Sequence, residues 1–148
     1  MRELAGGPRR RILEDLHHAY LEELRLARQL RLHAERVPYL PQARTLEDLA
    51  AQEDVHGASL EGEIRRLGGL PDLAGLGEPR GGRNHWERLS LDLAAIQAHG
   101  KRFIELAQRW DIDHPETATL LMRLAHEEGA LARVVGELLA RSDPHAVD

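Results

Sequence analysis

Apolar side chains recur every three to four residues through four long stretches of the chain, the spacing that places side chains on one face of an α-helix. The predicted helices span about residues 10–37, 41–67, 85–110 and 115–141. The apolar face of the first is formed by Leu13, Leu16, Tyr20, Ala27, Leu30, Ala34 and Val37. Short proline-containing breaks join the helices into two pairs, and a segment rich in Gly and Pro, residues 68–84, joins the pairs.

The length of that connecting segment restricts the topology. Its 17 residues can span roughly 55 Å when extended, whereas a helix of 25 residues is only about 37 Å long. The segment can therefore cross the full length of a bundle and make the second and third helices parallel. We predict an all-α fold in one domain, residues 1–148: a four-helix bundle of two helical hairpins joined by a long crossover.

Polar residues interrupt three of the four apolar faces at positions where core residues belong. They are Glu23 in the first helix, Glu53 and His56 in the second, and Glu128 in the fourth. Counted from the helix ends and converted at 1.5 Å per residue, Glu23 and Glu53 lie at the same height within about 3 Å. Glu128 falls at that height too, as does Ile96 in the middle of the third helix. The pattern predicts one polar layer across the bundle.

A metal ion would explain such a layer, because burying ionised carboxylates without partners costs several kcal/mol each. Glu53 and His56 are three residues apart on a helix, so both side chains can bind one cation. Oxygen ligands with an imidazole suit iron or manganese, as one ion or two. Two other interpretations stay open: a metal-free polar layer that fixes the register, and an exposed pair whose helix face is misassigned. Glu23 could instead pair with Arg25 or Arg28. On the fourth helix, Glu127 could face inward in place of Glu128.

Composition narrows the choice of function further. The chain has no cysteine, which excludes disulfides and thiolate metal sites. Its formal net charge of −5 argues against nucleic acid as a partner, since phosphate binding needs a basic surface. No apolar run is long enough to predict a transmembrane helix, and the first residues lack the apolar core of a signal peptide. We therefore expect a cytoplasmic protein without membrane contacts.

The hairpins, the crossover and the mid-helix polar residues together resemble the ferritin-like superfamily of carboxylate-bridged di-metal proteins, its rubrerythrin-like members most of all. The resemblance implies Glu23 as a ligand from the first helix, Glu53 and His56 as a Glu-x-x-His pair from the second, and Glu128 from the fourth. It implies a non-haem iron or manganese protein that acts on O2, peroxide or Fe(II). It also implies a homo-oligomer, for which we expect a dimer.

The second half of the family's ligand pattern is incomplete in this chain. Leu131 stands where a second His is due, and Ile96 or Gln97 stands where the third helix should supply a Glu. Gln97 or His99 could complete the site, with Asp92 and His99 forming a supporting pair. The alternative function is a metal-free helical module for interaction or dimerisation with a vestigial site. In that case exposed leucines of the connecting segment would dock a partner: Leu70, Leu73 and Leu76.

Overall fold

The computed structural model describes the backbone of residues 2–147 and the side chains of residues 7–147. The described backbone contains four α-helices and no strand: α1 (Arg2–Glu35), α2 (Leu40–Arg66), α3 (His85–Trp110) and α4 (Pro115–Ala140). The all-α prediction is confirmed. Helix bounds agree with the predicted ones within one or two residues, except that α1 begins at Arg2 and not near residue 10. Among the described residues, no helix combines the length and the apolar character needed to cross a membrane.

The end of α2 sets the direction in which the crossover leaves the hairpin. The Gly68 N–H donates to the Arg65 carbonyl and the Gly69 N–H to the Ile64 carbonyl, both at 2.9 Å. This pair of bonds places Gly68 in the left-handed region, with φ at +87°, where a Cβ would be strained. The predicted helix stop at these glycines is confirmed.

The two helices of the second hairpin begin with different kinds of residue. The Asn84 side chain caps α3 by accepting a hydrogen bond from the Glu87 N–H at 2.8 Å. Pro115 opens α4, where its missing N–H is not needed. The residue that caps α4 is His114, which makes no side-chain cap hydrogen bond.

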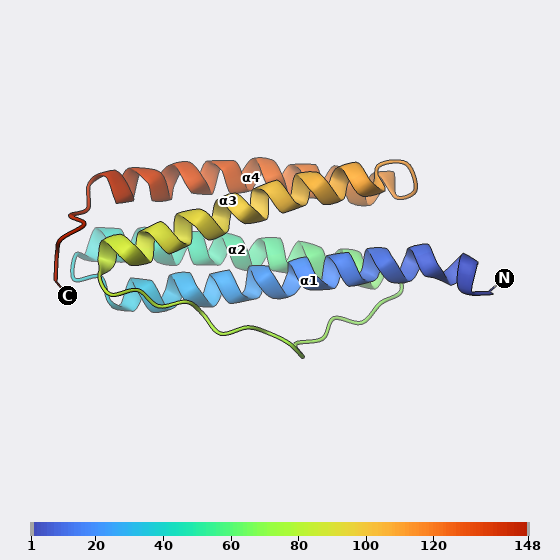
Figure 1. Ribbon diagram of the computed structural model, residues 1–148, viewed down its shortest axis with the longest axis horizontal. Helices are drawn as coiled ribbons and strands as arrows, with labels where there is room; N and C mark the ends of the chain where they lie inside the picture. The colour runs from blue at the N-terminus through green and yellow to red at the C-terminus, as the bar shows by residue number, and fades with distance from the viewer. Residues whose placement is uncertain (1, 148) are drawn as a thin grey trace.

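The bundle consists of two antiparallel hairpins, with α1 packed on α2 and α3 packed on α4 (Figure 1). Additional packing of α1 on α3 and of α2 on α4 joins the hairpins. Residues 67–84 run along the outside of the bundle from the end of α2 to the start of α3, at its other end (Figure 1). As a result α2 and α3 run in the same direction, as the length of this crossover predicts.

A buried network, here called the crossover network, ties the crossover to α1 and α3. The Asp92 carboxylate accepts hydrogen bonds from Gln29 Nε2 at 2.9 Å and from His33 Nδ1 at 2.8 Å. The backbone of Arg80 closes the network, with its N–H on Gln29 Oε1 at 2.9 Å and its carbonyl 2.8 Å from His33 Nε2. Every polar side-chain atom of these three residues has a partner.

The apolar core is divided into two clusters by a polar layer at mid-bundle. One cluster fills the end at which α2 finishes and α3 finishes, and includes Leu16, Leu60, Phe103 and Leu121. The other fills the opposite end and includes Leu30, Leu46, Leu89, Ile96, Leu131 and Val135. On every helix the break between the clusters coincides with a buried polar residue: Glu23, Glu53 with His56, His99 and Glu128. The predicted polar layer is present.

Candidate metal centre

The four residues predicted from the sequence meet at the centre of this layer and are here called the carboxylate cluster. Glu23 comes from α1, Glu53 and His56 from α2, and Glu128 from α4. Glu23 and Glu53 are fully buried, and Glu128 and His56 are 1% and 4% exposed. One ligand atom from each of the four lies within 4.8 Å of the others. Side chains from three helices therefore converge on one point.

His56 turns one nitrogen toward the cluster and the other toward the surface. Its Nδ1 lies 2.7 Å from Glu128 Oε1, 3.6 Å from Glu53 Oε1 and 3.9 Å from Glu23 Oε2. Its Nε2 lies 3.3 Å from Glu127 Oε2, on a side chain that is 41% exposed. The inward position on α4 thus belongs to Glu128, while Glu127 lies at the rim.

Several carboxylate oxygens in the cluster are buried without a hydrogen-bond partner among the described residues. Both oxygens of Glu53 are in this state, together with Oε2 of Glu23 and Oε2 of Glu128. Buried polar atoms are nearly always hydrogen-bonded, and an unsatisfied one costs about 1–3 kcal/mol. Arg25, one suggested partner for Glu23, instead binds Glu22 at 2.7 Å. The arrangement leaves four oxygens free to bind a cation.

The pKa values of the buried carboxyl groups also favour a cation site. Burial raises the pKa of Glu53, and the neighbouring carboxylates of Glu23 and Glu128 raise it further. Burial likewise raises the pKa of Glu23 well above its ordinary range. Carboxyl groups that cannot ionise in isolation become ionised when a cation replaces their protons. The cluster is therefore suited to exchange protons for a metal ion.

The third helix contributes His99, which the sequence pattern ranked only as a flanking residue. His99 Nδ1 lies 2.7 Å from Glu23 Oε1, and the side chain is 9% exposed. Gln97, the other suggested completion of the site, is exposed and lies outside the cluster. Seven of the nine buried positions of α3 follow a three-four alternation that includes His99 and could have identified it: Leu89, Asp92, Ile96, His99, Phe103, Leu106 and Trp110.

The expectation that Asp92 supports His99 is wrong. Asp92 belongs to the crossover network, where Gln29 and His33 occupy both of its oxygens. His99 instead binds Glu23 on α1. The two residues share a helix face, but each is paired across the α1–α3 interface with a different residue.

Two positions at which the ferritin-like ligand pattern calls for a further Glu on α3 and a second His on α4 are apolar and buried. Ile96 is fully buried and Leu131 is 3% exposed, and both belong to the core cluster on that side of the layer. Gly100 lies next to the layer instead, and a Cβ there would approach Glu128 Cβ to 3.4 Å. The space beside the carboxylate cluster is therefore filled by hydrocarbon toward Ile96 and Leu131.

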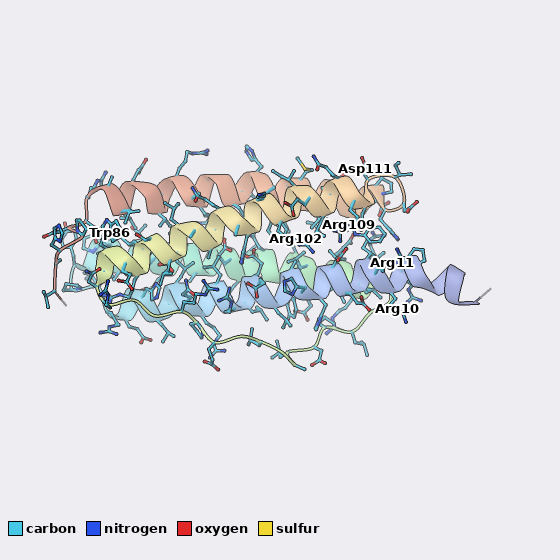
Figure 2. The ribbon with its side chains drawn as sticks, in the orientation of Figure 1. Arg10, Arg11, Trp86, Arg102, Arg109 and Asp111 are labelled. Carbon is cyan, nitrogen blue, oxygen red and sulfur yellow. The ribbon has the colours of Figure 1, made fainter. Side chains whose placement is uncertain are left out.

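A pocket of about 260 Å³ opens between α1 and α3 on the side of the layer that carries His99. Its lining is mostly apolar, with His99 and Glu22 among the polar residues. Arg102, labelled in Figure 2 on α3, also lines it. His99 thus stands between this pocket and Glu23, and its Nε2, 3.9 Å from Glu22 Oε2, has no hydrogen-bond partner among the described side chains.

Comparison with known proteins identifies the architecture. No family model and no curated protein matches the sequence. Among solved structures, the chain is similar to the bacterioferritin of Rhodobacter capsulatus, a structure described as having a metal-free dinuclear site and haem iron. The likeness has a TM-score of 0.81 at 21% sequence identity and covers 88% of this chain and 84% of that one. The chain has the ferritin-like four-helix-bundle fold.

Proposed function

We propose that this protein is a ferritin-like metal-binding protein in which Glu23, Glu53, His56 and Glu128 hold iron or manganese. The observation that carries the proposal is a buried group of four ligand atoms within 4.8 Å of one another. Four of its carboxylate oxygens have no other partner among the described residues. Three carboxylates and an imidazole form a donor set typical of iron and manganese sites in proteins.

The chemistry follows from the donor set and its surroundings. A bound iron or manganese ion would supply redox chemistry toward O2, peroxide or Fe(II). The chain's own contribution is to hold the ligands in place on three helices, with Glu53 positioned to use either oxygen. The two apolar core clusters border the layer toward the two ends of the bundle. We further propose that the protein is cytoplasmic and that it forms a homodimer. Light scattering of the purified protein would measure the mass of the oligomer.

A metal-free interaction module is the alternative. Its support is the exposure of two crossover leucines, Leu70 at 81% and Leu73 at 57%. In a metal-free module, however, the unpartnered oxygens of Glu53 would be a pure loss of stability. The carboxylate cluster therefore favours the metal-binding function.

Metal analysis of the purified protein tests the proposal. Wild type produced in iron- or manganese-replete medium is expected to carry stoichiometric metal. A double variant, Glu53→Ala with His56→Ala, is expected to carry none while retaining the circular dichroism of a helical bundle. An equal metal content in the two proteins, or wild type without metal, would contradict the proposal.

A further inference from the structure

His99 and His56 have closely similar surroundings on opposite sides of the polar layer. In each case Nδ1 lies 2.7 Å from a buried carboxylate, Glu23 for His99 and Glu128 for His56. In each case Nε2 faces a second, partly exposed glutamate, which comes directly before the buried one in the sequence. His99 Nε2 lies 3.9 Å from Glu22, and His56 Nε2 lies 3.3 Å from Glu127. The layer thus contains two imidazole–carboxylate pairs built from all four helices.

Each pair has the geometry of two ligands of one cation. An imidazole nitrogen and a carboxylate oxygen 2.7 Å apart can share a proton, as they do here. They can also share a metal ion: with bonds of about 2.1 Å, a separation of 2.7 Å corresponds to a ligand–metal–ligand angle of about 80°. That angle is close to the right angle of octahedral coordination. Replacement of the shared proton by a cation therefore keeps the two ligand atoms at a suitable separation, while the imidazole and the carboxylate turn toward the ion.

Glu53 can serve both pairs. It has no hydrogen-bond partner on either oxygen among the described residues, and it is fully buried on α2. Each pair also has a spare carboxylate oxygen, Oε2 of Glu23 and Oε2 of Glu128. A carboxylate with two free oxygens can bridge two cations. The four free oxygens can thus be divided between two ions, with Glu53 contributing one oxygen to each.

We propose that the site holds two metal ions and that His99 supplies the nitrogen ligand of the second. This inference rests on the proposed metal-binding function. In it, His56 and Glu128 bind one ion, His99 and Glu23 bind the other, and Glu53 bridges them. The nitrogen absent at Leu131 on α4 is replaced by one from α3, on the far side of the layer from the buried Leu131 and Ile96.

The pocket between α1 and α3 gives this second position a route to solvent. His99 lines the pocket of about 260 Å³, and Glu22 provides a carboxylate beside its Nε2. The pocket lies on the face of α3 that also carries Arg102 (Figure 2). On the other side of the layer, Nε2 of His56 faces Glu127. The second ion would therefore have a path for exchange with solvent through this pocket.

Metal stoichiometry of three proteins tests the inference: wild type, His99→Leu and the control His18→Leu. His18 lines the same pocket but is exposed and does not belong to the carboxylate cluster. After removal of metal and dialysis against Mn(II), wild type and His18→Leu are expected to bind about two ions per chain and His99→Leu about one. Electron paramagnetic resonance is expected to show a magnetically coupled Mn(II) pair in wild type and an isolated ion in His99→Leu.

The outcomes separate this inference from the function on which it rests. Wild type without Mn(II) would overturn both. One bound ion in wild type would overturn the claim of a second ion but not the metal-binding function. Two bound ions in His99→Leu would show that His99 is not needed as a ligand. Loss of both ions in His99→Leu would contradict the division into two pairs. If His99→Leu fails to fold, His99→Phe, which keeps a flat ring and offers no ligand atom, replaces it with the same expected loss of one ion.

Discussion

The crossover network and the carboxylate cluster are both buried polar groups, and they differ in how their atoms are paired. In the crossover network, both oxygens of Asp92, both ring nitrogens of His33 and both amide atoms of Gln29 have hydrogen-bond partners. In the carboxylate cluster, Glu53 has none on either oxygen among the described residues. Both groups are equally buried and both connect helices. Burial of charge alone therefore does not distinguish a structural network from a ligand-binding site.

The difference lies in what each group requires to be stable. The crossover network is complete as it stands, and it fixes residues 67–84 against α1 and α3 through the backbone of Arg80. In the carboxylate cluster, burial raises the pKa of Glu23 and Glu53, so these two carboxyl groups stay protonated unless a cation compensates their charge. We infer that the first group stabilises the fold, and we propose that the second is maintained for a ligand.

The largest expected effect concerns the network. Asp92→Ala leaves His33 and Gln29 buried without their shared partner. Leaving two buried donors unsatisfied, at about 1–3 kcal/mol each, is expected to lower the free energy of unfolding by about 2–6 kcal/mol. Urea denaturation of the metal-free protein would measure it. A loss below about 1 kcal/mol would show that Asp92 does not hold the crossover.

The second effect concerns the cluster and requires metal. A ligand that binds only the folded state at one hundred times its dissociation constant stabilises it by about 2.7 kcal/mol. For a chain of this size, Mn(II) is expected to raise the melting temperature on the order of 5–10 °C. Asp92→Asn is expected to retain this shift and Glu53→Gln to lose it. If Mn(II) raised the melting temperature of the two variants equally, the carboxylate cluster would not differ from the crossover network in metal binding.

The third effect is a gain in stability, whereas Asp92→Ala causes a loss. Without metal, Glu53→Gln is expected to stabilise the protein by about 1–3 kcal/mol at pH 7, because it removes an unsatisfied ionisable group. Since burial raises the folded-state pKa of Glu53, wild-type stability is fully present below the ordinary value of 4.5 and falls as the pH rises above it. The gain from Glu53→Gln should therefore vanish near pH 4, as denaturation at several pH values would show. A gain that does not change with pH contradicts this explanation.

The smallest effect comes from a carboxylate that is paired. Arg66 binds Glu63 at 2.7 Å and lowers the pKa of that carboxyl, with Thr117 adding a further hydrogen bond. Arg66 is 46% exposed, so Glu63→Gln is expected to cost only about 1 kcal/mol at pH 7. Because this folded-state pKa is lowered, the contribution is lost as the pH falls through it. Comparison of the acid denaturation of the two proteins would test this, and an increasing cost toward low pH would contradict it.

The sequence predicted the helices, the crossover and the four cluster residues, because apolar periodicity is a local property. Glu23, Glu53 and Glu128 stood out as polar residues at core positions of a regular pattern. Their heights along the helices could be counted at a fixed rise per residue. Since these quantities do not depend on neighbouring helices, the level of the polar layer was predictable.

The third helix was harder to interpret, because a polar residue on a core face resembles one on its flank. Asp92 and His99 are buried on α3, whereas their apolar or small neighbours Leu93 and Gly100 are only partly buried. Which of two adjacent positions faces inward depends on how α3 rotates against α1 and α4. The partners of His99 and Asp92, Glu23 and His33, lie 76 and 59 residues away in the chain. No local pattern specifies such contacts.

The central claim is that the unpartnered group is a metal site and the partnered group is not. Anomalous X-ray diffraction from crystals grown with Mn(II), collected near the manganese edge, tests it most directly. The account predicts anomalous density at bonding distance, about 2.0–2.3 Å, from Glu53 and His56, and none at Asp92 or His33. Density confined to other residues, or no density between Glu23, Glu53 and Glu128 at saturating Mn(II), would contradict it.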